Sequence, residues 1–276
     1  MIEKDTLTLI CENLSLAKKF SSSLNTEFMG KNLLAFPQVN STNNLALLLI
    51  ESSLPPPGTV IIADYQTSGR GQKGNRWYAP YGCCLLFSII LFSPFNLRPI
   101  TPLLSIITGL SLVETLKIHK ITSNIKWPND IYYKGKKTGG ILIESKSRAD
   151  FYQKLVVGIG INIKPIMWEE KELSHKATTL GLIEKNVREE VLKNFLYVFE
   201  RNYKLFLQKN FATFKEQWKK SSLTFNKEVE ILLPGSSIKG IEKGLNNKLH
   251  LVVEEKLTGK NHHINNGKLI YPFDNK

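Results

Sequence analysis

The chain has 276 residues, 42% of them apolar, which is enough for one large domain with an appendage or for two domains. Its formal net charge of +13 raises nucleic acid as a class of partner. The N-terminus mixes acids and bases among its apolar residues, unlike a secretory signal, and the nearly apolar stretch at 83–92 is far too short to span a bilayer. Adjacent Cys83 and Cys84 are poorly placed to pair with each other. We therefore expect a reducing, cytoplasmic protein without a membrane anchor.

Two helices are predicted in the first half of the chain. The segment 41–53 begins with Ser41 or Thr42 as its N-cap, and the Pro-Pro-Pro-Gly run at 55–58 ends it. The second helix covers 101–120, where Thr101 is the N-cap, Pro102 is the first helical residue and the apolar residues fall on one face.

Strands are predicted where runs of β-branched and apolar residues occur, at 59–63, 84–92, 141–144 and 154–163. The third of these runs belongs to a predicted hairpin at 131–144, whose turn lies near Lys134 and Gly135.

The pattern changes after residue 165. Segments 187–208 and 211–220 carry apolar residues at three- and four-residue spacing and are predicted to be helical. From Asn226 onward the sequence holds only short strands and turns, about fifty residues that indicate a small β-barrel. The chain therefore divides into an α/β domain, a helical connection and a C-terminal β module.

The loop SGRGQKGNRW at 68–77 raises the question of a phosphate site, since Gly69, Gly71 and Gly74 fit the spacing G-x-G-x-x-G. A dinucleotide-binding loop would follow its strand directly and open a helix, whereas WYAPYG follows here. A kinase loop would have valine where Arg76 stands, and a Walker A loop would have Gly-Lys-Ser/Thr. All three interpretations fail, and a basic surface turn is the remaining simple alternative.

The loop lies in a stretch without acids. From Tyr65 to Val113 there is no Asp or Glu, while Arg70, Lys73 and Arg76 are present. Such a stretch suits a small anionic ligand as well as it suits DNA.

Four further motifs surround the loop in a fixed order: STN at 41–43, KWPND at 126–130, KKTGGIL at 136–142 and VVGIGIN at 156–162. Together the five motifs resemble the biotin protein ligase family over residues 35 to 165, and a C-terminal β module is also typical of that family. Gln72 and Asn75 depart from the family loop, in which arginines are frequent at those places. Backbone N–H groups there can still line a phosphate.

The resemblance implies an α+β fold: a mixed-sheet catalytic domain of the biotin/lipoate ligase type with a small SH3-like β-barrel. It implies a short extension at 1–34, a catalytic domain at 35–222 and the barrel at 223–276. The implied activity is that of an ATP-dependent ligase, which makes biotinyl-5′-AMP and passes biotin to a lysine of a biotin carboxyl carrier domain. Mg²⁺ would accompany ATP, its ligands supplied largely by the phosphates.

The resemblance also assigns residues to ligands. Lys137, Arg70 and Asp130 are the catalytic candidates: Lys137 at the biotin carboxylate and α-phosphate, Arg70 as a loop cation facing the phosphate, and Asp130 as the base for the carrier lysine. The biotin-binding candidates are Ser41, Thr42, Asn43, Gln66, Arg70, Gly71, Gln72 and Lys137. The adenylate candidates are Gly69, Gly71, Trp77, Lys126, Asn129, Gly139, Gly140 and Asn162.

Simpler roles stand beside these. Ser-Thr-Asn before an apolar run is a common helix cap, Lys137 fits an exposed hairpin, and Asn129 with Asp130 fits a turn. Gly139 and Gly140 fit a β-bulge, and Asn162 fits a strand end bonded to backbone. No metal ligands are expected: His262 and His263 are not accompanied by a third ligand, which favours a surface strand.

Alternatives at the level of function also remain. A lipoate ligase shares the fold and the adenylation chemistry, and the charge keeps open a nucleic-acid-binding protein. About 34 residues precede the core, against the roughly sixty that a winged helix needs, so we expect no specific DNA binding. The oligomeric state is open, with a homodimer among the alternatives.

Overall fold

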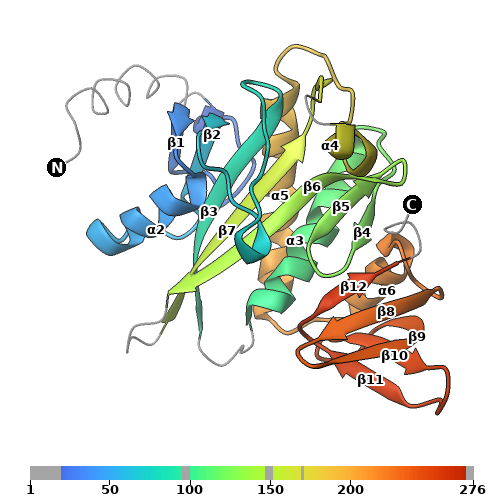
Figure 1. Ribbon diagram of the computed structural model, residues 1–276. Coiled ribbons are helices and arrows are strands. Elements are labelled where there is room, and N and C mark those ends of the chain that lie inside the picture. Colours follow the sequence, from blue (N-terminus) through green and yellow to red (C-terminus); the bar gives the residue numbers. More distant parts are fainter. Residues whose placement is uncertain (1–19, 95–99, 147–151, 169–170, 272–276) are drawn as a thin grey trace.

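The computed structural model describes residues 20–94, 100–146, 152–168 and 171–271. Its larger sheet contains β1 Leu33–Val39, β2 Val60–Gln66, β3 Cys84–Pro94, β4 Asn124–Lys126, β5 Asp130–Tyr133, β6 Lys136–Lys146 and β7 Tyr152–Asn162. The strand order is β1-β2-β3-β7-β6-β5-β4 (Figure 1). β1 and β2 run parallel and the other neighbours run antiparallel, so the sheet is mixed.

Helices cover both faces of this sheet (Figure 1). They are α2 Thr42–Ser52, α3 Ile100–Ile118, α4 Lys171–Lys176, α5 Val187–Leu207 and α6 Ala212–Ser221, with a 3₁₀ turn at Gln72–Gly74. Alternation along the strands separates the two faces. On β3, Phe87 and Ile89 belong to the main core with α3 and α5, whereas Ile90 packs with Ala46 and Ile50 of α2.

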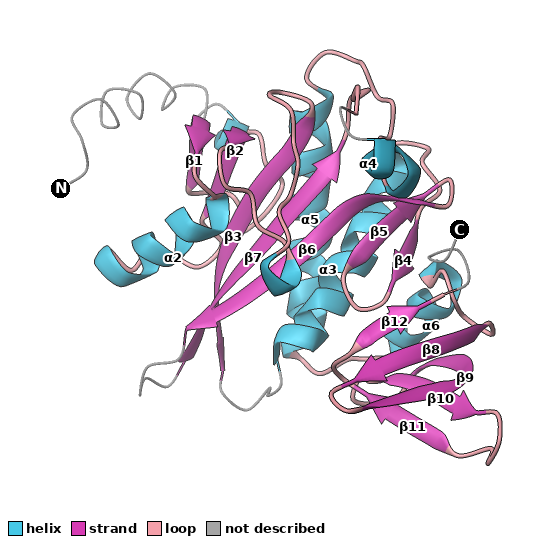
Figure 2. Cartoon of the chain, in the orientation of Figure 1, coloured by secondary structure: helices cyan, strands magenta, loops and turns pink. Residues whose placement is uncertain are grey.

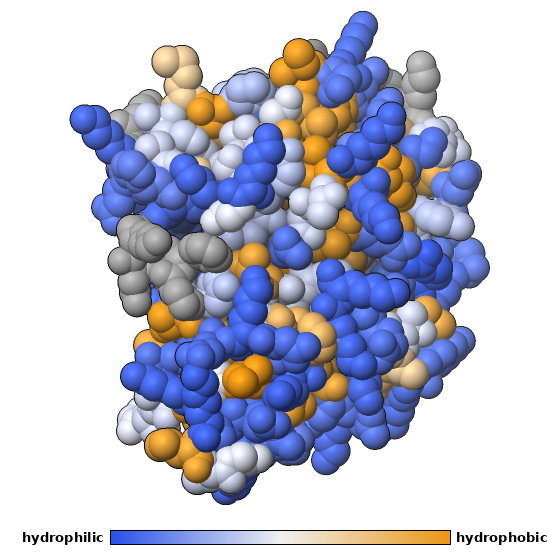
Figure 3. Space-filling model, turned by 90° about the vertical axis from the view of Figure 1, so that its right-hand side faces the viewer, coloured by the Kyte–Doolittle hydropathy of each residue, from blue (hydrophilic) through white to orange (hydrophobic). Residues whose placement is uncertain are grey.

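Helix α3 is the central helix of the main core. It is long and apolar enough to cross a membrane by length and composition alone, but 72% of its most apolar window is buried inside the protein. It begins at Ile100, so Thr101 lies inside the helix rather than at the expected cap. The face of the molecule in Figure 3 is mostly hydrophilic, with apolar residues in smaller patches.

A second sheet follows at the C-terminal end. It contains β8 Glu228–Leu233, β9 Ser236–Leu245, β10 Leu251–Glu255, β11 Asn261–Ile264 and β12 Lys268–Ile270. All pairs in its order β11-β10-β9-β8-β12 are antiparallel (Figure 2). The expected α+β class, a mixed sheet with helices and a small C-terminal β module, is confirmed.

A buried carboxylate fastens α6 to this second sheet. Glu242 of β9 accepts hydrogen bonds from Trp218 Nε1 at 2.7 Å and from the hydroxyls of Ser222 and Thr224. Burial raises the pKa of Glu242, while these neutral donors and Lys227 oppose the rise.

The described part of residues 1–34 packs on the main core rather than extending from it. Leu24, Met29 and Leu33 are buried there. Glu200 of α5 accepts hydrogen bonds from the backbone N–H groups of Glu27, Phe28 and Met29, at 2.8, 3.0 and 2.9 Å. These three hydrogen bonds hold the chain against α5 just before β1.

Candidate functional site

A cavity of about 260 Å³ opens on the face of the large sheet that also carries α2. Its walls come from the start of α2, the glycine loop, the turn before β5, strands β6 and β7, and β12. Most of the expected site residues line it: Ser41, Thr42, Asn43, Gln66, Arg70, Gly71, Gln72, Trp77, Lys126, Asn129, Asp130, Lys137 and Gly140. Motifs far apart in the sequence therefore meet in one site.

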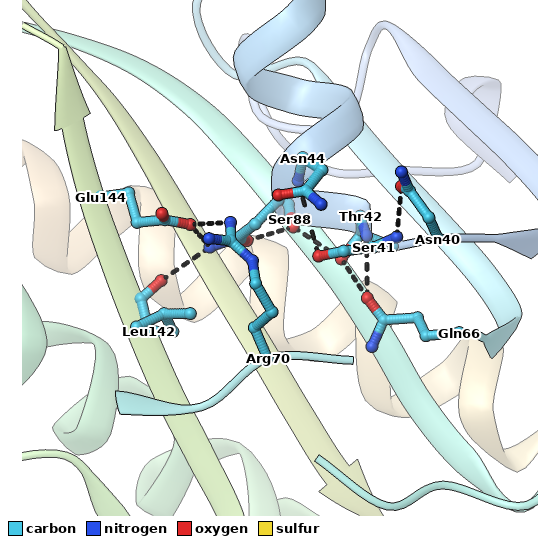
Figure 4. A network of polar contacts seen from close by, with 10 residues as sticks. Asn40, Ser41, Thr42, Asn44, Gln66, Arg70, Ser88, Leu142 and Glu144 are labelled. Carbon is cyan, nitrogen blue, oxygen red and sulfur yellow. Dashed lines mark hydrogen bonds and ion pairs between the residues drawn. The ribbon is translucent and has the colours of Figure 1, made fainter. Parts of the chain in front are cut away.

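Uncharged polar side chains gather at the end of the cavity near α2 (Figure 4). Ser41 caps the helix by accepting from the backbone N–H of Asn44 at 3.5 Å. The backbone N–H and hydroxyl of Thr42 lie 2.8 and 3.2 Å from Gln66 Oε1. Ser41 thus caps the helix and also lines the cavity.

Asn43 is held by neighbours on three strands. Its Nδ2 donates to Leu142 O at 3.2 Å and to Glu144 Oε2 at 2.8 Å, and its Oδ1 lies 2.6 Å from Ser88 Oγ. A Cβ at Gly158 would lie 2.1 Å from this Oδ1. Only glycine leaves the room that Asn43 occupies.

The indole ring of Trp77 packs against two glycines that face each other on neighbouring strands. Gly140 of β6 pairs with Gly160 of β7 in the sheet. A Cβ at Gly160 would lie 2.7 Å from the indole Cε2, and one at Gly140 would lie 3.1 Å from Cζ3. The indole Nε1 is buried without a hydrogen-bond partner among the described residues. The glycines of GGIL and GIG thus let an aromatic ring lie against the sheet.

Lysines from the end of β4 and from β6 also line the cavity. Lys137 Nζ lies 2.6 Å from Asp130 Oδ1 and 5.7 Å from the centroid of the Trp77 ring. Lys126 is nearly buried, with Nζ 5.6 Å from the centroid of the Tyr132 ring. Asn129 connects the turn before β5 to β6 by two hydrogen bonds. Its side-chain Nδ2 donates to Ile141 O at 2.8 Å, and its backbone carbonyl accepts from Ile141 N at 2.9 Å.

The C-terminal module contributes Gly267, Lys268 and Leu269 to the wall, which the sequence motifs did not indicate. The described residues that line the cavity include six cations, at Arg70, Lys73, Arg76, Lys126, Lys137 and Lys268. Asp130 is the one carboxylate among those described lining residues. The site is therefore built for anions.

Three expected site residues do not line the cavity. Gly69 accepts from Trp77 N at 2.9 Å within the loop, and Gly139 packs close to Ile131. The side chain of Asn162 donates to Thr178 O at 3.0 Å and accepts from Cys84 Sγ at 3.4 Å. This is the strand-end role that was the simpler alternative.

The other side chains singled out from the sequence lie elsewhere. Burial raises the pKa of the Cys84 thiol to about 12, as expected of a core cysteine. His262 and His263 lie on β11, and His262 Nε2 is 3.3 Å from Glu255.

Comparison with known proteins agrees with the motifs. The biotin/lipoate A/B protein ligase family matches residues 35–162. The bifunctional ligase/repressor BirA of Bacillus spizizenii is 31% identical over 235 residues, covering 84% of this chain and 72% of its own. The BirA of Escherichia coli is 29% identical, covering 82% and 70%.

A solved structure agrees as well. The biotin protein ligase from Aquifex aeolicus in complex with biotin and ATP is 31% identical, with a TM-score of 0.73, covering 87% of this chain and 98% of its own. The chain therefore belongs to the biotin protein ligase family.

Proposed function

We propose that the protein is a biotin protein ligase, which activates biotin as biotinyl-5′-AMP with ATP and transfers it to a lysine of a biotin carboxyl carrier domain. One observation carries the proposal: a single cavity is lined both by uncharged polar side chains, such as Thr42 and Gln66, and by six cations among the described residues. Biotin has a polar ureido ring, an apolar chain and a carboxylate, and ATP adds phosphates beside that carboxylate. The polar and charged groups of this ligand pair match the kinds of side chain that line the cavity.

The polar end favours biotin over lipoate. Thr42, Asn43 and Gln66 offer donors and acceptors to the ureido group. The dithiolane ring of lipoate offers no N–H or carbonyl in return. It would therefore form fewer hydrogen bonds with these side chains than the ureido group can form.

In the first half-reaction, a biotin carboxylate oxygen attacks the α-phosphorus of ATP, and pyrophosphate leaves with the electrons of the broken P–O bond. Two anions must approach each other, so cations at that point lower the barrier. We assign this role to Lys137, with Arg70 from the loop. Lys126, Asn129, Gly71 and Gln72 complete the wall around the phosphates and carboxylate. Mg²⁺ would accompany ATP, with its ligands supplied largely by the phosphates, and would offset part of their charge.

In the second half-reaction, a neutral carrier lysine attacks the biotinyl carbonyl and AMP leaves. The amine must lose a proton, and Asp130 is the carboxylate among the described lining residues that can accept it. Asp130 is paired with Lys137. When the adenylate phosphate engages Lys137, the carboxylate becomes available to the amine, which would order the two steps.

The glycine loop acts as a lid in this proposal. Lys73 and Gly74 take φ values of +56° and +80°, and a bridge between Arg70 and Arg76 closes the loop as a narrow turn. Trp77 is the last residue of the loop, and its indole ring packs against Gly140 and Gly160. Closure would exclude water from the reactive mixed anhydride. We assign Gly69, Gly139 and Asn162 to the support of these walls.

The wider assignments are also proposals. We divide the chain into a segment at 1–34, a catalytic domain at 35–222 and the β module at 223–276, with β12 completing the site. We place the enzyme in the cytoplasm, without sequence-specific DNA binding. A monomer and a homodimer both fit this division of the chain.

Transfer to protein tests the proposal. The enzyme, biotin, MgATP and a purified biotin carboxyl carrier domain are mixed, and the carrier mass is followed. We expect the mass to rise by one biotinyl group on one lysine. A carrier that stays unmodified, together with tight and sequence-selective DNA binding in a gel shift at physiological salt, would support the nucleic-acid-binding alternative instead.

A further inference from the structure

Glu144 connects two walls of the cavity although it is not itself a lining residue. It lies on β6, two residues after the KKTGGIL motif, opposite Val156 of β7. Its side chain points toward Arg70 of the glycine loop (Figure 4) and also accepts a hydrogen bond from Asn43 of α2. None of the motifs gave it a role.

One oxygen of Glu144 joins the polar end to the loop. Oε2 accepts from Asn43 Nδ2 at 2.8 Å and from the guanidinium NH2 of Arg70 at 2.7 Å. Arg70 is the first cation of the loop, and Asn43 faces the uncharged end of the cavity. A single carboxylate thus touches two candidate ligand-binding residues that come from different elements.

The contact also fixes which way the Asn43 amide points. Leu142 O and Glu144 accept from its Nδ2, while Ser88 Oγ lies beside its Oδ1. Rotating the amide would place Oδ1 against the carboxylate, and two acceptors repel. Glu144 therefore sets which face of Asn43 is presented to a ligand.

We propose that Glu144 is a positioning residue, which anchors the glycine loop over the cavity through Arg70 and orients Asn43 for the ureido ring. This rests on the proposed function, because it names the role of Asn43 by that of biotin. The side chains of Arg70 and Glu144 are 38% and 25% exposed, so solvent screens the pair and its effect is moderate.

Proteolysis of the ligand-free enzyme tests the anchor. A lysine-specific protease cuts after Lys73 in the loop, and mass spectrometry follows that fragment. Arg70→Ala does not alter this cleavage site. We expect Glu144→Ala and Arg70→Ala each to raise the cleavage rate by about three- to tenfold, and the double variant to show no further rise, since both remove one contact.

Matched variants separate charge and geometry from general damage. Glu144→Gln keeps one carbonyl oxygen that can accept from both Asn43 and Arg70, but it removes the charge. We expect the rate of cleavage after Lys73 to rise by about twofold and the affinity for biotin to stay nearly unchanged. Glu144→Ala should weaken biotin binding by about tenfold in calorimetry, because Asn43 is no longer oriented. Glu51→Ala removes the exposed Lys146–Glu51 pair between the same helix and strand. Glu51→Ala should change neither the rate of cleavage after Lys73 nor the affinity for biotin.

Cleavage of Glu144→Ala at the wild-type rate would overturn the anchor, as would additive effects of Glu144→Ala and Arg70→Ala. If circular dichroism shows that Glu144→Ala is unfolded, Glu144→Gln decides, and an unchanged cleavage rate overturns the proposal. Failure of the wild type to bind biotin would refute the ligase assignment, but would leave the cleavage result valid for the anchor.

Discussion

The ammonium of Lys137 lies 2.6 Å from Asp130 Oδ1, so the two candidate catalytic groups offset each other's charge. Lys137 is on β6 and Asp130 begins β5, and a shift in strand register next to Tyr132 brings the side chains together. We propose that each group serves a different half-reaction.

Lys137 should matter chiefly for making the adenylate, because it offsets the repulsion between carboxylate and phosphate. Loss of one electrostatic donor typically costs about a hundred- to a thousandfold in rate, so Lys137→Ala should slow pyrophosphate release by about that much. Lys136→Ala is the neighbouring control, since Lys136 Nζ donates to Ser174 O away from the cavity. Equal slowing by both variants would show that the hairpin, not the charge, was affected.

Asp130 should matter chiefly for transfer, where an ammonium must lose its proton. Asp130→Asn keeps the size of the side chain and removes the base. We expect it to form biotinyl-AMP but to transfer it slowly at pH 7. A higher pH should restore part of the rate, because more of the carrier lysine is then neutral without help. A variant that fails at adenylate formation yet transfers supplied biotinyl-AMP normally would show the assignment to be wrong.

Lys268 should contribute to ATP binding from the C-terminal module. It lines the cavity from β12, and a cation there attracts the phosphates. Lys268→Ala should raise the KM for ATP by about three- to tenfold and leave that for biotin nearly unchanged. Lys239→Ala, on an exposed part of the same module, is the control. Equal effects on both substrates would point to a structural role for the module.

Glu200 should make stability depend on pH. Burial works to raise the pKa of Glu200, but the backbone N–H groups of Glu27, Met29 and Phe28, together with Lys204, lower it below 4.5. A lowered pKa adds stability above pH 4.5, and this is lost as the pH falls. Glu200→Gln should therefore lower the free energy of unfolding by about 1–3 kcal/mol at pH 7 and by much less near pH 3. Urea unfolding at both pH values measures this, with exposed Glu184→Gln as the control.

The elements with strong local signals could be predicted from the sequence. The helix after Ser41, the hairpin at Lys134–Gly135 and the long helices α3 and α5 carry caps, turn residues or apolar periodicity, and the structure contains all of them. β1 was missed because LLAFPQV holds a proline and lacks alternation. β4 was missed because three residues are too few for a period. The polar helix α4 was missed because KELSHK has no apolar stripe.

The candidate site divides in the same way. Motif residues such as Thr42 and Lys137 could be assigned because their segments resemble a family. No local sequence pattern indicates the positions of Ser88, Glu144 and Lys268. The first two are brought to the site by the register of the strands, and Lys268 is brought there by the packing of the second sheet. The position of Gly158 could have been recognised from the sequence. Glycines two residues apart in GIG share one face of a strand, which indicates that another group packs closely against that face.

Biotin-dependent exchange of labelled pyrophosphate into ATP tests the ligase assignment, because it reports the adenylate step without a carrier domain. Purified enzyme is incubated with MgATP and labelled pyrophosphate, with biotin, with lipoate or with neither. We predict rapid exchange with biotin and none above background with lipoate. Exchange that requires lipoate, or no exchange with either acid from a folded enzyme, would contradict the assignment.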